Sequence, residues 1–395
     1  MKILHTSDWH LGQKFMGKSR EDEHLAFLDW IIDTINEEKI DVLIIAGDIF
    51  DTGTPPNYAL EMYYNFLKNL NASSCKNIVI IGGNHDSVAT LRTSSKLLKV
   101  LNIDVIASGD TDEENIIKIY KESELRGIIC AVPFLRDTIV RKSLGGQSSQ
   151  DKEKALNDGI TSYYTSIYDD AKEIRGGNSV PIVATGHLTT VGSKTSESER
   201  EIYIGNTLNI SSGFLGNMFD YVALGHLHLS QKVGCEHVRY SGSPIPLSFS
   251  EATSQKKVNI VTFDNQIAEI VELDIPLFRP LRVIKGNGSS VINELSGVEN
   301  KNTWIEIHLK DDNPQATIQL IHELCRELDL TILAIKTDRS VEILTINDIE
   351  VSSLDEIKPI EVFEKRMEMS VIEDDAMKSN LISRFKDIIN EVELV

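Results

Sequence analysis

Five apolar segments of this sequence end in the same way: each stops at a small residue, and Asp, Asn or His follows at once. The segments read ILHTSDWHLG, VLIIAGDIFD, VIIGGNHDS, VATGHLT and VALGHLHLS. Short apolar runs bounded by turn-forming residues are typical of buried strands. Ligand-binding side chains of open α/β sheets lie beyond the carboxyl ends of the strands, so we expect the five loops to converge on one site. A glycine before the polar residue permits a sharp turn there.

The converging side chains have the chemistry of a two-metal site. Carboxylate oxygens and imidazole nitrogens, without thiolates, suit manganese, iron or zinc. Asp8 and His10, like His226 and His228, are two residues apart in an extended segment, so each pair points to one side. Asp48 has two oxygens and can bridge ions about 3.5–4 Å apart. We therefore predict seven metal ligands: Asp8, His10, Asp48, Asn84, His187, His226 and His228.

A lone histidine or a single such motif is usually structural, and we interpret the remaining histidines outside these motifs in that way. His85 is different, because it follows Asn84 directly and cannot easily point in the same direction. We interpret it as a catalytic group, either a general acid or a positive charge facing a phosphate. A neighbouring carboxylate would hold its tautomer, and Asp51 and Asp86 are both candidates. Loop capping is the alternative role for these two aspartates.

Composition describes a globular chain with an acidic balance. Its 395 residues, 41% of them hydrophobic and 25% charged, predict two or three domains. No apolar run approaches the ~18 residues of a membrane span. The sequence also lacks a signal-peptide core, and its four cysteines are far apart, so we expect a cytoplasmic protein with reduced thiols.

The net charge of −20 argues against a broad basic face that binds nucleic acid. It does not exclude a nucleic-acid substrate held by local contacts. Scattered basic residues usually mark only a solvated surface. The basic residues that follow the metal motifs are therefore weak candidates for such contacts: Lys14, Lys18, Arg20, Arg92, Lys96 and Lys194.

Residues 1–275 alternate strand-like runs with helical stretches, which predicts a layered α/β domain. Residues 24–39 have helical spacing, with Leu25, Leu28 and Ile31 among the residues on the expected buried face. Residues 258–275 predict a hairpin around Asp264 and Asn265. The stretch 142–154 predicts an exposed loop.

The pattern changes after residue 275. Residues 276–345 alternate strands and helices and predict a small α+β domain, with strand-like runs Leu281–Ile284, TWIEIHLK, TILAIKT and VEILTI (341–346) and a helix in ATIQLIHELCREL. Residues 346–395 contain acidic amphipathic stretches and predict a helical tail. An amphipathic helix suits a groove on a partner, although packing on its own chain has the same pattern.

The motifs DWHLG, GDIFD, GNHD, GH and GHLH resemble the calcineurin-like metallophosphoesterase superfamily. Four longer phrases resemble its SbcD-like nucleases, and metal binding does not require the last two: TSDWHLG, AGDIFDTGTPPNYA, YSGSPIPLSFSEA and FRPLRV. The resemblance implies a β-sandwich nuclease domain flanked by helices, a capping domain over residues 276–345 and a tail that binds an SbcC-like coiled-coil ATPase. It also implies a homodimer through the helices within residues 56–70 and 91–101.

The same resemblance implies two manganese ions. One would be held by Asp8, His10, Asp48 and His228, and the other by Asp48, Asn84, His187 and His226. The implied activity is two-metal hydrolysis of DNA, as a 3′-to-5′ double-strand exonuclease and a hairpin or single-strand endonuclease in repair, recombination and replication.

Two alternatives remain at this point. A phosphodiesterase acting on a small phosphoester would use the same ligands, and fold analogy alone does not separate the two. A non-enzymatic scaffold for an ATPase would need no metal, but none of the expected ligands is missing.

Overall fold

The computed structural model describes residues 1–110, 114–140, 149–195, 198–199, 210–311 and 314–337, with tail positions 381, 384 and 385. The chain divides into two compact units, Met1–Asp338 and Arg339–Val395. Apart from helical positions 381, 384 and 385, the predicted tail (residues 346–395) lies outside the described residues. No helix among the described residues is both long and apolar enough to cross a bilayer.

Two six-stranded sheets form the body of the first unit. One contains β1 (Lys2–Thr6), β4 (Val42–Ala46), β5 (Asn77–Ile81), β6 (Ile103–Ile106), β13 (Lys257–Asp264) and β14 (Ile267–Asp274), in the order β14-β13-β1-β4-β5-β6. The other contains β7 (Ile116–Lys121), β8 (Glu124–Cys130), β9 (Ile182–His187), β10 (Tyr221–Gly225), β11 (Gln231–Val233) and β12 (Cys235–Tyr240), in the order β11-β12-β10-β9-β8-β7. The strands that end in the predicted motifs run parallel within each sheet.

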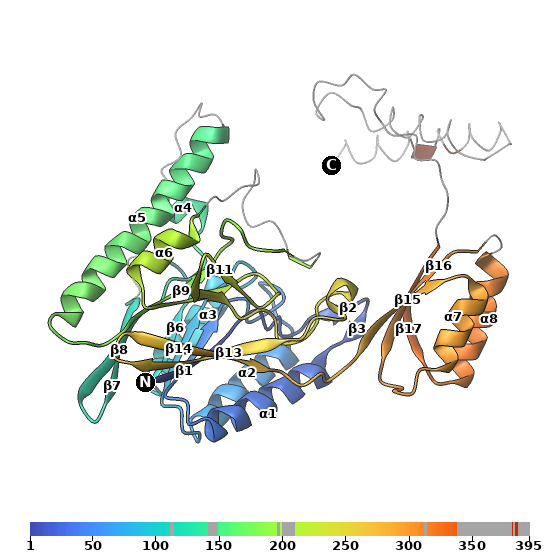
Figure 1. Ribbon diagram of the computed structural model, residues 1–395, viewed down its shortest axis with the longest axis horizontal. Coiled ribbons are helices and arrows are strands. Elements are labelled where there is room, and N and C mark those ends of the chain that lie inside the picture. Colours follow the sequence, from blue (N-terminus) through green and yellow to red (C-terminus); the bar gives the residue numbers. More distant parts are fainter. Residues whose placement is uncertain are drawn as a thin grey trace. The chain divides into compact units, whose positions relative to one another are not determined.

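Apolar side chains fill the space between the sheets, because alternate residues of each strand point inward. Ile44 and Val79 of the first sheet pack there with Val183 and Ala223 of the second. Helices α1 (Glu21–Glu37), α2 (Asn57–Leu70) and α3 (Val88–Lys99) pack on the first sheet, whereas α5 (Ser149–Arg175) and α6 (Ser212–Met218) pack on the second (Figure 1). The predicted α/β fold of sheets and helices is confirmed.

Local predictions had mixed outcomes. The hairpin is confirmed as β13 and β14, with Asn265 in the left-handed conformation at φ 53°. The buried face of α1 is confirmed at Leu28 and Ile31, but it is wrong at Leu25, which is 42% exposed, and Phe27 is buried instead. The loop prediction is wrong for residues 149–154, which form the first turns of α5.

A third, all-parallel sheet contains β15 (Leu281–Gly286), β16 (Trp304–Leu309) and β17 (Thr331–Thr337), with α7 (Gly288–Ser296) and α8 (Pro314–Glu327) packed on it. Ile284, Val291 and Ile321 belong to its own apolar core. Its boundary as a domain of residues 276–345 stays a prediction. The predicted strand at 341–346 lies outside the described residues.

The third sheet contacts the two-sheet body through an aromatic cluster. The hairpin β2 (Lys14–Phe15) and β3 (Lys18–Ser19) follows the first metal motif, and the short helix η1 is Phe249–Glu251. Phe15 and Phe249 pack with Leu281 and Trp304 of the third sheet. The chain around the first motif and η1 is thereby tied to this sheet.

Candidate metal centre

All seven predicted ligands lie together, where β1, β4, β5, β9 and β10 end. Their ligand atoms form two groups, each within 4.8 Å: Asp8 with His10 and His228, and Asp48 with His187 and His226. Asp48 Oδ2 joins the groups, since it is 3.2 Å from His187 Nε2 and 3.8 Å from His10 Nε2. The seventh residue, Asn84, has its Oδ1 2.9 Å from His187 Nε2. The geometry is that of two adjacent sites with one carboxylate between them.

Four of these residues have a backbone conformation that non-glycine residues seldom adopt. The φ angles are 54° at Asp8, 48° at His10, 49° at Asp48 and 96° at His226. Each costs on the order of 1–3 kcal/mol, and such strain persists where the surroundings hold it and is concentrated at functional sites. Main-chain hydrogen bonds between loops hold it here, because Asp8 N donates to Gly47 O and His10 N donates to Asp48 O, both at 3.0 Å.

Glycines at this edge provide space as well as a turn. Gly47 has a φ of 89°, and a Cβ there would be 2.3 Å from His187 Nδ1. A Cβ on Gly83 would be 2.2 Å from Asp48 Oδ1. A side chain at either position would displace a predicted ligand.

The residues fit a pair of divalent cations. Within the described part of the chain, Nε2 of His10 lacks a hydrogen-bond partner although the residue is only 3% exposed, while Nδ1 faces the Asp51 carboxylate at 3.5 Å. A buried polar atom left unsatisfied costs about 1–3 kcal/mol, which coordination would remove. Carboxylate, amide and imidazole donors of this kind suit manganese, iron or zinc.

Burial and mutual charges perturb the ligands in the metal-free protein. Burial raises the pKa of Asp8 to about 7 and lowers the pKa of His226 to about 3. Burial alone would lower the pKa of His187, but the Asp48 carboxylate raises it to about 9. Burial opposes the charge on Asp48 as well, yet His187 holds the pKa of that carboxyl well below its usual range. In the metal-free protein, protonated His187 thus compensates the charge of the Asp48 carboxylate, as a bound cation would.

Hydrogen bonds fix which nitrogen two of these histidines present. His187 Nδ1 donates to the carbonyl of Ala46 at 2.9 Å, which leaves Nε2 as the metal-facing atom. Ser198 Oγ donates to the carboxylate of Glu251, because that group can only accept, and therefore accepts from His228 Nδ1 at 2.6 Å. Nε2 of His228 is thus the nitrogen left available to a metal as well.

A buried ion pair, Glu251 with Lys256, supports His228 through Ser198 and through the main-chain carbonyl of His228. Lys256 Nζ is 2.5 Å from Glu251 Oε2, and the two side chains are 5% and 4% exposed. Lys256 also donates to His228 O at 3.0 Å and to Ser243 Oγ at 2.9 Å. The charge of Lys256 lowers the pKa of Glu251 despite its burial. Sequence reasoning singled out the surrounding phrase YSGSPIPLSFSEA but missed this role, which depends on contacts between distant residues.

His85 lies beside the two ligand groups, 4.9 Å from His10 between ring centroids. Its Nδ1 donates to the main-chain carbonyl of Asp51 at 2.7 Å, so Nε2 is the nitrogen whose protonation can change. The Asp51 carboxylate instead lies 3.5 Å from His10 Nδ1. The Asp86 carboxylate has the capping role, since it accepts hydrogen bonds from the main-chain amides of Ile49, Phe50 and Gly83. Burial raises the pKa of Asp86 to about 6. The Asp51 carboxylate also lies within 4.8 Å of the His10 and His85 ring nitrogens, so its part in orienting His85 stays a prediction.

Arg20, a proposed surface contact, is wrong for that role because it is fully buried. It pairs with Glu23 at 2.5 Å and lies over the rings of Phe15 and Trp304. Its position in the sequence, after the first metal motif, gave no indication of this packing.

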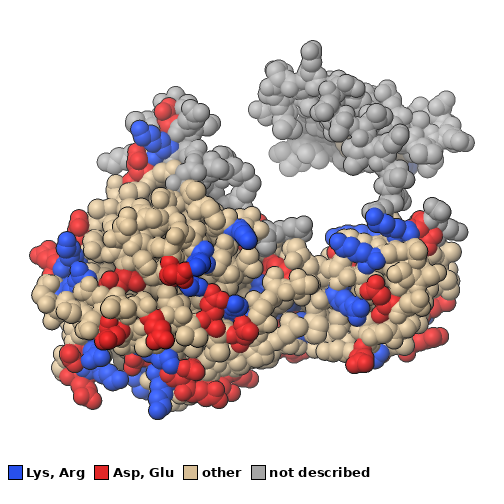
Figure 2. Space-filling model, in the orientation of Figure 1, with Lys and Arg blue, Asp and Glu red and all other residues tan. Residues whose placement is uncertain are grey.

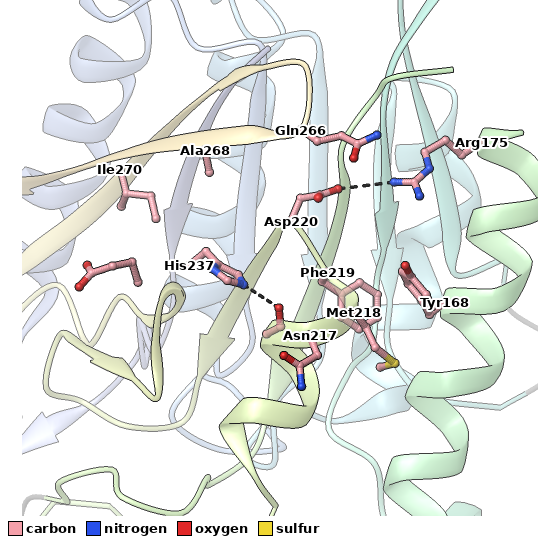
Figure 3. A pocket seen from close by; sticks show the side chains of 12 residues that line it. Tyr168, Arg175, Asn217, Met218, Phe219, Asp220, His237, Gln266, Ala268 and Ile270 are labelled. Carbon is pink, nitrogen blue, oxygen red and sulfur yellow. Dashed lines mark hydrogen bonds and ion pairs between the residues drawn. The ribbon is translucent and has the colours of Figure 1, made fainter. Parts of the chain in front are cut away.

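Two cavities differ in their relation to the site. One of about 850 Å³ is lined by Asn84 and His85 and so adjoins the ligand groups. Another, of about 390 Å³, is shown in Figure 3 and is lined by Arg175, Asp220 and His237 but by none of the predicted ligands. It lies near the start of β9 and β10, at the opposite ends of the strands.

Comparison with known proteins identifies the class that this fold and site define. The calcineurin-like phosphoesterase family matches residues 1–230, and the chain belongs to that family. Within it the chain is a member of the SbcD branch. It is 40% identical over 381 residues to the SbcD subunit of the SbcCD nuclease from Escherichia coli strain K12 and from Escherichia coli O157:H7, with 95% of this chain and 94% of those proteins covered.

A second family, described as the type 5 capsule protein repressor C-terminal domain, matches residues 277–371. A solved dimetal phosphatase from Danio rerio is 10% identical, with a TM-score of 0.38 over 70% of this chain and 99% of that one. At that score the likeness carries no weight.

Proposed function

We propose that this chain hydrolyses DNA phosphodiesters with two manganese ions, as the nuclease subunit of an SbcCD-type complex. The observation that carries the proposal is the pair of buried ligand groups joined by Asp48, beside His85. Two divalent ions would supply an activated water and offset the charge of the phosphate. Asp8, His10, Asp48 and His228 would hold one ion, and Asp48, Asn84, His187 and His226 the other.

His85 would protonate the leaving oxygen through Nε2, because Nδ1 is committed to the Asp51 carbonyl. Protonated imidazole would also stabilise the charge of the transition state. The Asp51 carboxylate would act indirectly, by fixing the ring of His10. Work of this kind in repair, recombination and replication would take place in the cytoplasm.

The partner would be an SbcC-like coiled-coil ATPase bound through residues 346–395. The acidic amphipathic pattern of that segment and the match of residues 277–371 to the C-terminal family support this assignment. The net charge of −20 supports a division of roles between this chain and the ATPase. On the face drawn in Figure 2, Lys and Arg are interspersed with Asp and Glu. The ATPase would supply much of the affinity for DNA.

A homodimer would form through α2 and α3. Tyr64, Leu97, Val100 and Leu101 are exposed apolar residues on or directly after these two helices, with Val100 78% exposed. Other apolar residues of these two helices, including Tyr63 and Leu98, are buried in the chain's own core. The exposed four therefore define the surface for a second copy.

Manganese-dependent degradation of linear duplex DNA, measured beside hydrolysis of bis(p-nitrophenyl) phosphate, tests the proposal. We expect cleavage of both substrates, stimulated by ATP when the ATPase partner is present. Activity on the small ester alone would favour the small-phosphoester alternative. Retention of all biological function by Asp48→Asn would favour the scaffold.

A further inference from the structure

The loop that follows β8 joins the metal edge although it carries no predicted ligand. β8 pairs parallel with β9, so it ends at the same edge as His187. Phe134 N donates to Gly82 O at 2.8 Å, and its ring lies 6.4 Å from that of His187. These contacts fix the loop beside the Asn84–His85 turn.

Arg136 projects from this loop into the cavity of about 850 Å³ that Asn84 and His85 also line. Among the residues that the structure describes, the one polar contact of its guanidinium is a long 3.4 Å hydrogen bond to the carbonyl of Asp86. The carboxylates that line the same cavity have other partners: Asp51 faces His10 at 3.5 Å, Asp86 caps loop amides, and Asp110 pairs with Arg92 at 2.8 Å. Arg136 therefore presents a positive charge to which no described carboxylate is paired.

Arginines at other concave sites of this chain are compensated. Arg175, in the cavity of Figure 3, faces Asp220 at 3.8 Å. Arg279, in a further cavity of about 130 Å³, pairs with Glu23 at 3.2 Å. In a protein of net charge −20, where carboxylates outnumber cations, a guanidinium beside the site without such a carboxylate indicates a place for an anion.

We propose that Arg136 binds the phosphate next to the scissile one, on the side of the leaving group, and so makes the site specific for a polynucleotide. This rests on the proposed function. A guanidinium fork matches the oxygens of a phosphate and can donate two hydrogen bonds to it. The assignment to the leaving-group side follows from His85, which lines the same cavity and would protonate the leaving oxygen.

A small diester has no second phosphate and cannot use this contact. For the full chain loaded with manganese, Arg136→Ala should lower kcat/KM on DNA by about 10- to 100-fold, the range for a charge-assisted hydrogen bond. Hydrolysis of bis(p-nitrophenyl) phosphate should change by no more than about threefold. Arg136→Lys should recover part of the loss, because it restores charge but not the fork.

The matched control is Arg126→Ala, which removes the same charge from an arginine of β8 itself. Arg126 is 43% exposed at its side chain and pairs with Glu124, away from the cavity. The control should keep activity on both substrates. The salt dependence of DNA binding should fall by about one counterion in Arg136→Ala and less in the control.

A chemical cycle identifies the phosphate. An oligonucleotide can carry a neutral methylphosphonate at the linkage next to the cleaved one, on the leaving-group side. For the wild-type chain, kcat/KM on this oligonucleotide should be lower than on unmodified DNA by the same factor that Arg136→Ala produces. It should cost that variant little more, because the two partners of one contact are not additive. Full additivity would overturn the assignment.

The outcomes separate the two claims. A wild-type chain that cleaves only the small ester would overturn the proposed function and this assignment with it. A wild-type chain that cleaves DNA, with Arg136→Ala indistinguishable from Arg126→Ala, would overturn the assignment alone. Equal losses by Arg136→Ala on DNA and on the small ester would do the same, since they would indicate a structural role.

Discussion

The buried pair of Glu251 and Lys256 gives a sharp test of how the protein holds its metal ligands. Glu251→Gln leaves the size of the side chain unchanged but removes the charge that compensates Lys256, which is only 5% exposed. Breaking a buried pair from one side typically costs about 3–5 kcal/mol. We therefore expect the free energy of unfolding of the metal-free protein to fall by about 3 kcal/mol.

The same substitution should weaken metal binding through His228. The Glu251 carboxylate accepts from Ser198, which in turn holds Nδ1 of His228. Loss of such an outer partner typically lowers metal affinity about 10- to 100-fold. Titration calorimetry with manganese should show one weakened site and one site that is nearly unchanged, because His187 has its own partner at the Ala46 carbonyl.

Glu236→Gln is the matched control. Glu236 also pairs with a lysine, Lys232, and with Arg239 at 2.9 Å, but its own side chain is 67% exposed, and exposed pairs contribute only about 0–1 kcal/mol. The double variant Glu251→Gln/Lys256→Met should be more stable than the sum of its single changes predicts, since no unpaired charge remains. If Glu251→Gln matched the control in denaturant unfolding and in manganese affinity, the network would have no role in holding His228.

Three further predictions concern catalysis, pH and assembly. His85→Gln should keep two manganese ions per chain while cleavage falls about 10²- to 10⁴-fold, and near-normal turnover would remove its catalytic role. Burial lowers the pKa of His5 and of His24 to about 3, so these two histidines bind protons more tightly in the unfolded chain. The free energy of unfolding of the metal-free protein should therefore fall as the pH drops below about 6.5, by up to about 1.4 kcal/mol per pH unit for each histidine. Melting curves of the metal-free protein at different pH values measure this loss. The pKa of His187 is raised to about 9, so its contribution is present below about pH 6.5 and lost as the pH rises through 9, whereas manganese-loaded protein should lack that alkaline loss. Leu97→Glu, on the exposed surface of α3, should shift a dimer to monomer in sedimentation equilibrium, and an unchanged mass would exclude this surface as the interface.

Much of the fold could be predicted because its strands are short, continuous apolar runs. The run Val42–Ala46 is a strand over those same residues, and all its side chains are buried. Helix α7 was missed because Gly286, Asn287 and Gly288 look like the end of a strand. Asn287 is instead an N-cap, whose side chain accepts from Ser290 N at 3.0 Å.

The convergence of the seven predicted ligands could be predicted because each lies at or just after the end of its strand, and parallel strands end at a common edge. Contacts between side chains could not be predicted in this way. Asp51 contacts His10 with its carboxylate and His85 with its main-chain carbonyl, and this arrangement depends on loop geometry. Arg136 had no motif to mark it, and its role is visible only from its neighbours.

Anomalous diffraction from crystals of the full chain soaked in manganese tests the central claim most directly. We predict two peaks about 3.5–4 Å apart, with Asp48 coordinating both and three histidine Nε2 atoms, those of His10, His187 and His228, among the ligands. Asp48→Asn should weaken both peaks. A single peak, or two peaks of which Asp48 touches at most one, would contradict the two-metal account.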